Sequence, residues 1–261
     1  MKQRSTIGLI LLAGIMVLAL NTTAASNSEQ PQAPEQSYLY KATFVRAAPG
    51  KLLDLITLYK NHMTAYDAAG DERPFWWRHT QGDQWDLMLL FPMQSYEEYY
   101  TPKRVAKRSN AWGGSSLPAG KFQGEFQSCA AWHEDLFVMG PPLAKVIEEF
   151  DGSAYFHIEI FVALPGKHEE LLKERVMENI YQTGIGRPWN MIFIKDQGAA
   201  WDLFTLGCYR DLQHWASSYA GSNEQREAAA RKAGFEGPDA IGPYMRTLIF
   251  MHRDTMGVAI K

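Results

Sequence analysis

Two stretches of sequence decide the fold: YLYKATFVRAAPGK at residues 38–51 and YFHIEIFVALPGK at residues 155–167. Both are rich in the β-branched and aromatic residues that favour strands. Both end in Pro-Gly-Lys, where a run with apolar residues at helical spacing begins. The two triplets lie 116 positions apart, which indicates that one strand-to-helix unit occurs twice in the chain.

Further landmarks recur in the same order. Trp85-Asp86-Leu87 returns as Trp201-Asp202-Leu203, again after 116 positions. Arg73-Pro74 and His133-Glu134-Asp135 also return, as Arg187-Pro188 and His252-Arg253-Asp254. A fixed order at nearly constant spacing predicts a duplication, with a first repeat over residues 38–150 and a second over 151–261.

Each repeat has the pattern of a strand, a helix, two strands, a helix and a strand. For the first repeat we expect strands at 38–46, 74–80, 85–91 and 126–132, helices at 51–67 and 95–110, and a loop at 113–124. For the second we expect strands at 155–164, 189–195, 201–206 and 244–251, and helices at 167–181, 211–219 and 224–233. A βαββαβ unit is ferredoxin-like, with its helices on one face of an antiparallel sheet. The bare faces of two such sheets can cover one another.

On these landmarks the chain resembles the dimeric α+β barrel superfamily over about residues 38–256. Its members include antibiotic-biosynthesis-type monooxygenases, EthD-like and NIPSNAP-like proteins, and the tandem-repeat chlorite dismutases. The resemblance implies an α+β fold in which two ferredoxin-like repeats pack sheet to sheet as an intramolecular barrel, so that a monomer is plausible. It also implies oxygenation, isomerisation or cyclisation in an apolar pocket. By analogy with the chlorite dismutases, His214 beside Trp215 is the place to look for a haem ligand.

The first 25 residues are typical of a cleavable export signal. Lys2 and Arg4 precede the apolar run Ile7–Leu20, and small residues follow up to Ala25. An uncleaved anchor is the alternative. Residues 26–37 are polar and predict a flexible tether, so we expect a periplasmic or secreted protein. No later segment is apolar enough to insert stably in a membrane.

Composition excludes several classes of protein. Hydrophobic residues make up 46% and charged residues 21%, as in a packed globular protein. A formal charge of −3 argues against nucleic-acid binding, which needs a basic face. With two cysteines there is no disulfide scaffold and no thiolate cluster. We expect Cys129 and Cys208 to be buried thiols, with a disulfide as the alternative.

The first strand of each repeat alternates between an apolar and a mixed face. We expect the apolar faces to lie under the helices, and the opposite faces to send Lys41, His157 and Glu159 into the space between the sheets. His157 and Glu159 lie two residues apart on one face and are our candidates for acid–base catalysis. The alternative is a structural network in which a Lys–Glu ion pair accompanies a satisfied histidine.

Asp86 and Asp202 occupy equivalent strand positions between large apolar residues. They could face one another across the pseudo-twofold axis and bind a ligand there, as metal ligands or as acids. Alternatively, each accepts backbone N–H bonds or pairs with Arg73 or Arg187, since buried carboxylates are usually paired.

The His-x-Asp pairs near the end of each repeat have a spacing that suits metal ligands. The candidates are His133 and Asp135 with His252 and Asp254. No further ligands are evident, so we predict no tightly bound cofactor; a divalent metal or haem is the alternative.

The second strand of each repeat is aromatic, with Phe75-Trp76-Trp77-Arg78-His79 matched by residues 189–193. Trp76, Trp77 and Asn190 could line a pocket, and Arg78 and His79, present only in the first repeat, could be catalytic. An ordinary core is the alternative. We therefore expect an exported protein that binds or transforms a small apolar or aromatic molecule in a barrel-type pocket. The alternative is a non-catalytic periplasmic ligand-binding or structural protein.

Overall fold

A computed structural model describes residues 38–114, 119–217 and 221–261. The expected export signal at 1–25 and tether at 26–37 lie outside these residues. The strands are β1 Tyr38–Ala47, β2 Phe75–Gln81, β3 Leu87–Gln94, β4 Ala130–Gly140, β5 Tyr155–Ala163, β6 Asn190–Gln197, β7 Leu203–Tyr209 and β8 Ile249–Ala259. The helices are α1 Leu52–Ala69, α2 Tyr96–Tyr99, α3 Pro102–Gly114, α4 Ala119–Cys129, α5 Leu143–Asp151, α6 His168–Gly184, α7 Leu212–Ser217, α8 Asn223–Ala233 and α9 Pro238–Arg246.

The strands close into a single barrel in the order β1-β3-β2-β8-β5-β7-β6-β4. Within each repeat the order is last strand, first, third, second, as expected of a ferredoxin-like unit. The two sheets join at both edges, where β2 pairs with β8 and β4 pairs with β6, both antiparallel. The prediction of two ferredoxin-like repeats forming an intramolecular α+β barrel is confirmed, and the closure leaves neither sheet with a free edge.

The last strand of each repeat lies farther along the chain than predicted. The expected strand at 126–132 is wrong because α4 continues to Cys129. The expected loop at 113–124 is helical at 113–114 and 119–124, which are the residues of it that the structure describes. The expected strand at 244–251 is wrong because α9 continues to Arg246. The added strand length closes the barrel: Phe137–Met139 pair with β6, and Met256–Ala259 pair with β2.

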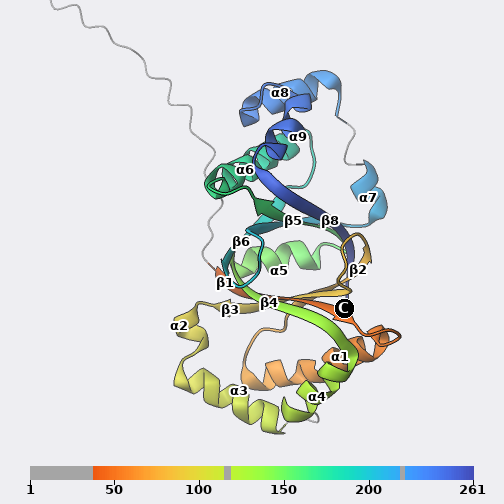
Figure 1. Ribbon diagram of the computed structural model, residues 1–261, viewed down its shortest axis with the longest axis vertical. Coiled ribbons are helices and arrows are strands. Elements are labelled where there is room, and N and C mark those ends of the chain that lie inside the picture. The colour runs from red at the N-terminus through yellow and green to blue at the C-terminus, as the bar shows by residue number, and fades with distance from the viewer. Residues whose placement is uncertain (1–37, 115–118, 218–220) are drawn as a thin grey trace, which may run out of the picture. The chain divides into compact units, whose positions relative to one another are not determined.

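The barrel interior is a packed apolar core. It is lined by the alternate residues of β1 and β5 that the sequence analysis placed under the helices, namely Tyr40, Ala42, Phe44, Phe156, Ile158 and Ile160. Helix α5, which connects the repeats, packs Val146 and Phe150 onto this core (Figure 1). The assignment of the two strand faces was therefore wrong. A closed interior without access to water accepts only apolar side chains, whereas a face covered by helices can hold polar groups near its margin.

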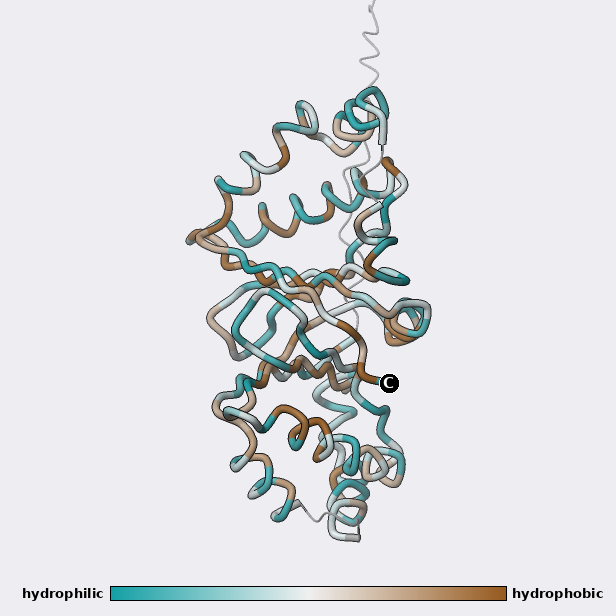
Figure 2. The backbone as a smooth tube through the Cα atoms, turned by 90° about the vertical axis from the view of Figure 1, so that its right-hand side faces the viewer, coloured by the Kyte–Doolittle hydropathy of each residue, from teal (hydrophilic) through white to brown (hydrophobic). Residues whose placement is uncertain are grey.

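Lys41, His157 and Glu159 consequently lie on the outer face of the barrel, toward the helices. In the first repeat α1 and α4 cover that face, with Leu55, Tyr59 and Phe126 packed on Val45 and Leu89. In the second repeat α6 covers it, with Leu171 against Phe161 and Leu203, and α8 packs on α6. Figure 2 shows hydrophobic and hydrophilic residues alternating along the helices, as expected of helices that bury one side against a sheet.

Both cysteines are buried free thiols, as predicted. Cys129 ends α4 and Cys208 lies on β7. Among the described helices, none combines the length and apolar character needed to cross a membrane.

Candidate functional site

Four ionisable side chains converge on the outer face of the second repeat. His157 and Glu159 come from β5, and His252 and Asp254 from the neighbouring β8; we call this set the α6 cluster. Glu159 pairs with Asp254 across the two strands, and Phe161 pairs with His252, so all four side chains point to the same side. The sequence places them there because both strands carry ionisable residues at alternate positions.

Asp254 lies between the two imidazoles. His157 Nε2 is 3.0 Å from Asp254 Oδ1, and His252 Nε2 is 3.1 Å from Asp254 Oδ2. The Thr205 hydroxyl, on β7, donates to Glu159 Oε2 at 3.0 Å. One candidate ligand atom from each of His157, Glu159 and Asp254 lies within 4.8 Å of the other two. The cluster is therefore compact enough to act on one atom or group.

The cluster runs from solvent into the protein. The side chain of Asp254 is 51% exposed, whereas that of His157 is 15% exposed. At the buried end lies Arg175 of α6, whose guanidinium forms ion pairs with Glu174 at 2.6 Å and Glu178 at 2.5 Å. A small molecule can thus reach Asp254 from outside.

Burial and neighbouring charges perturb the ionisation of these groups. Burial would lower the pKa of His157, but its hydrogen bond to Asp254 and the nearby charge of Glu159 raise this pKa above its ordinary value. Burial raises the pKa of Glu159. The hydrogen bond from His157 lowers the pKa of Asp254. Two neighbouring carboxyl groups with pKa values shifted in opposite directions are typical of functional sites, although structural networks show this too.

The first repeat has a different set of groups at the matched positions. Lys41 and Thr43 of β1 stand where β5 has His157 and Glu159. Lys41 Nζ lies 3.7 Å from Asp135 Oδ1 and 4.6 Å from the centre of the Phe91 ring. The Thr43 hydroxyl donates to the same carboxylate. Asp135 is thus balanced by an ammonium of the chain itself.

Asp86 and Asp202 hold the chain where the first strand of each repeat ends. The backbone N–H of Ala47 donates to Asp86 at 2.8 Å, and that of Ala163 donates to Asp202 at 2.7 Å. The interpretation that each aspartate accepts backbone N–H bonds is confirmed. Pairing of Asp86 with Arg73 is wrong, because Arg73 binds Asp67 instead.

The other predicted site residues do not gather in one place. Trp76 lies on the outer face against Tyr59, whereas Trp77 points into the barrel core. Arg78 is exposed, and His79 Nδ1 lies 4.0 Å from Asp86. Asn190 is buried at the start of β6, where its backbone N–H and C=O bond to the Asn179 side chain. Adjacent strand residues necessarily face opposite sides, which separates the two tryptophans.

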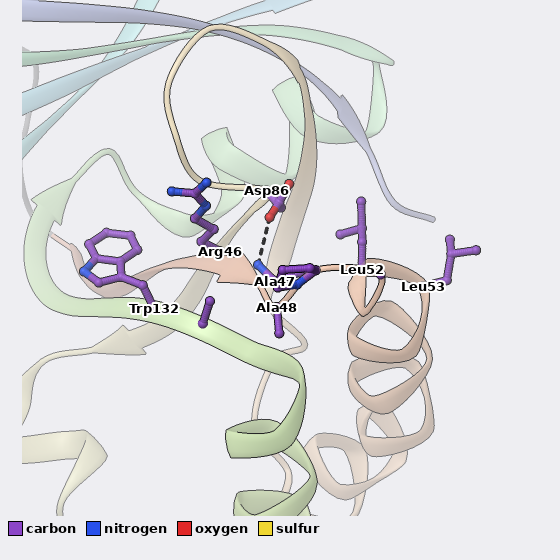
Figure 3. A pocket seen from close by; sticks show the side chains of 10 residues that line it. Arg46, Ala47, Ala48, Leu52, Leu53, Asp86 and Trp132 are labelled. Atoms are coloured by element: carbon purple, nitrogen blue, oxygen red, sulfur yellow. Dashed lines mark hydrogen bonds between the residues drawn. The ribbon is translucent and has the colours of Figure 1, made fainter.

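A groove of about 670 Å³ lies beside the start of α1 (Figure 3). It is lined by Arg46, Ala47, Ala48, Pro49, Gly50, Leu52, Leu53, Asp86, Ala131 and Trp132. Its one carboxylate, Asp86, is turned to the N–H of Ala47, and Leu53 at its rim is 74% exposed. It offers no converging set of polar groups, so we place the functional site at the α6 cluster.

His62 is a buried histidine of α1 that the sequence analysis left without a role. It is 1% exposed, and neither ring nitrogen has a hydrogen-bond partner among the described residues. The rings of Trp112 and Phe122 lie 4.2 and 4.6 Å from its own, centre to centre, which leaves no room for a haem plane. Burial lowers the pKa of His62, so its imidazole is uncharged near neutral pH.

The haem candidate of the sequence analysis, His214, lies on α7. Its Nδ1 accepts the backbone N–H of Arg210 at 3.2 Å. The chemistry proposed below does not depend on haem.

Sequence reasoning found all four members of the α6 cluster but separated them into two sites. His157 and Glu159 were placed inside the barrel, and His252 and Asp254 at a strand end. The first and last strands of a ferredoxin-like unit are neighbours. That rule, applied to His-x-Glu on one strand and His-x-Asp on the other, is the signal that would have joined them.

Comparison with known proteins supports the fold alone. No protein-family model and no curated protein matches this sequence. Among solved structures, an anthrone oxidase-like protein superposes with a TM-score of 0.55 at 11% identity, over 88% of this chain and 93% of that one. A protein from Fusobacterium nucleatum, provisionally named a monooxygenase, gives 0.50 at 9% identity, over 86% and 93%. Together with the closed eight-stranded barrel, these similarities identify the chain as having the dimeric α+β barrel fold, with both halves in one polypeptide.

Proposed function

We propose that this protein is an enzyme that transforms a small organic molecule at the α6 cluster. The observation that carries the proposal is the convergence of two carboxyl groups and two imidazoles in a half-open position, with Asp254 in contact with both histidines. Ionisable groups brought together with perturbed pKa values are a general mark of catalytic sites.

The contrast between the repeats supports this choice. The same scaffold carries an internally balanced Lys41–Asp135 pair in one repeat and the α6 cluster in the other. A purely structural requirement would apply equally to both copies. The extra ionisable groups of the second repeat therefore favour a chemical role.

Buried apolar side chains pack beside the cluster, since Phe161 is 0% and Met256 5% exposed. Phe161 stacks on the His252 ring, 5.7 Å between centres, and Met256 shares this face of the sheet. The structural neighbours bear the names of an oxidase-like protein and a monooxygenase, which fits a small apolar or aromatic substrate.

We further propose that residues 1–25 direct export to the periplasm, and that the chain works as a monomer because it supplies both halves of the barrel.

Incubation with a library of small aromatic carbonyl and phenol compounds, followed by mass spectrometry of the products, tests the proposal. Wild type is compared with His157→Gln and with Lys41→Gln, the matched change in the first repeat. Conversion that is lost in His157→Gln and kept in Lys41→Gln supports the proposal. Equal conversion by all three proteins would contradict it, and binding without conversion would favour the non-catalytic alternative.

A further inference from the structure

The two repeats differ in how they neutralise the aspartate of their last strand. In the first repeat the Lys41 ammonium lies 3.7 Å from Asp135. In the second repeat His157 replaces the lysine and Glu159 adds a carboxylate beside Asp254. Compared with the first repeat, the second therefore has a histidine in place of the lysine and one more carboxylate at the same place.

We infer that a divalent transition-metal ion bound by His157, Glu159 and Asp254 occupies this place. Because this metal site coincides with the proposed reactive centre, its chemical purpose rests on the proposed function. The geometry of the side chains, their charge balance and the donor types each support it.

The spacing of the donor atoms suits a common ion. Zinc–ligand distances of about 2.1 Å place neighbouring ligand atoms about 3.0 Å apart at right angles and about 3.4 Å apart in a tetrahedron. His157 Nε2 and Asp254 Oδ1 are 3.0 Å apart. The complete set of three lies within 4.8 Å, so small side-chain rotations bring every donor onto one ion.

The charges of the cluster also call for a cation. Glu159 receives a hydrogen bond from the neutral Thr205 hydroxyl, and Arg175, the guanidinium nearest to it on α6, is engaged by Glu174 and Glu178. Within the described residues no lysine or arginine forms an ion pair with Glu159 or Asp254; the groups that pair with Asp254 are the imidazoles of His157 and His252. A divalent ion would balance the two carboxylates, as Lys41 balances Asp135.

The donor set indicates the class of metal. Imidazole together with carboxylate favours zinc, manganese or iron(II) over magnesium and calcium, which prefer oxygen ligands alone. Three protein ligands and a solvent-facing Asp254 leave a coordination position open, as in catalytic metal sites. His252 Nε2 lies 3.1 Å from the second oxygen of Asp254, Oδ2. Thr205 orients Glu159, as hydrogen bonds from outside the ligand set commonly do.

Metal binding by the full chain tests the inference. After treatment with a chelator, Zn²⁺ and Mn²⁺ are titrated by calorimetry, and the metal retained after dialysis is measured by mass spectrometry. We expect one equivalent per chain and a melting temperature that rises with metal concentration. Thr205→Val should weaken binding about 10- to 100-fold.

The decisive variant is the double change His157→Lys with Glu159→Thr, which installs the arrangement of the first repeat. It should keep its fold, checked by circular dichroism, and lose the bound equivalent. His168→Gln removes a different histidine, 3.0 Å from Asp202, and should bind as wild type does.

Binding of no metal by wild type, with Glu159 and Asp254 sharing a proton instead, would overturn the inference, as would undiminished binding by the double variant or by a folded His157→Gln protein. If metal binds but no compound of the library is converted, the proposed function fails and the metal site stands. If conversion depends on His157 but no metal binds, the proposed function stands and the metal site is wrong.

Discussion

Gly82, in the turn between β2 and β3, lies so close to the carbonyl oxygen of Asp254 that a β-carbon at Gly82 would be 2.2 Å from it. The matched turn of the second repeat repeats this contact, since a β-carbon at Gly198 would lie 3.0 Å from the carbonyl oxygen of Asp135. Each repeat thus supports the last strand of the other. The backbone that presents Asp254 is positioned by the first repeat, which explains how a site in one half depends on both.

Gly82→Ala should destabilise the protein by more than about 2 kcal/mol, because it adds a steric overlap with backbone at a residue with φ +117°. Urea unfolding measures the loss. Gly242→Ala in α9, where a β-carbon meets nothing within 4 Å, is the control and should be neutral or slightly stabilising. Equal stability of the two variants would show that the close contact between Gly82 and the backbone of β8 does not stabilise the protein.

Replacing Arg175 by Met should cost about 3–5 kcal/mol of unfolding free energy, because the carboxyl groups of Glu174 and Glu178 would lose their partner. Burial raises the pKa of Glu174 to about 7 even beside Arg175, so without it this carboxyl has to take up a proton. The side chain of Arg175 is 2% exposed, so water cannot take its place. Arg175→Lys keeps the charge and should lose less. Thermal and urea unfolding of both variants check this; a Met variant as stable as the Lys variant would mean that the charge network contributes nothing.

His62→Phe should raise stability by about 1–3 kcal/mol, because it removes two buried ring nitrogens that lack partners among the described residues. It should also change the response to acid. Burial holds the pKa of His62 below the value of 6.5 that the unfolded chain has. Below that pH the unfolded chain therefore binds a proton that the folded protein does not.

The wild type should accordingly lose stability as the pH falls below 6.5, by up to about 1.4 kcal/mol per pH unit on account of this one proton. Urea unfolding at a series of pH values, compared with His62→Phe, isolates the contribution. Parallel curves for the two proteins would mean that His62 titrates equally in both states.

Asp86→Ala and Asp202→Ala should each cost about 1 kcal/mol or more, because the N–H groups of Ala47 and Ala163 lose their acceptors. The loss should be larger for Asp202, which also lies 3.0 Å from His168 and 3.5 Å from Lys195. Chemical unfolding compares them directly. Metal binding should be unchanged in both, and its loss would show that these aspartates belong to the site.

The repeat made the fold predictable. Matched landmarks such as Pro49–Lys51 and Pro165–Lys167 identified two ferredoxin-like units, and such units leave a bare sheet face that has to be covered. What the sequence did not reveal was which face of β1 and β5 became the interior. Alternation separates Tyr40 from Lys41 but does not say which side is enclosed, and only closure of the barrel at β2–β8 and β4–β6 decides it.

The site was predictable residue by residue but not as a unit. Strand spacing showed that His157 and Glu159 share a face, and likewise His252 and Asp254. Their meeting depends on the register between β5 and β8, in which Glu159 pairs with Asp254. Most of β8 lies beyond residue 251, whereas the sequence analysis placed this strand at 244–251, where α9 still continues to Arg246. The pairing of residues 252–258 with β5 was therefore not predicted. The role of Asp86 and Asp202 was predicted correctly, because the hydrogen bond from a backbone N–H to the aspartate recurs at the matched position of each repeat.

The central claim is that the two repeats share a scaffold while only the second carries the chemical centre. Nitrogen-15 spectra of the imidazole rings, recorded as Zn²⁺ is added, test it most directly, because the chain has seven histidines spread over both repeats. We predict that the His157 ring signals shift on binding one equivalent, and that those of the neighbouring His252 respond as well. The signals of His133, which is the residue of the first repeat matched to His252, should stay unchanged. Signals that do not move, or that move equally for His133 and His157, would contradict the account.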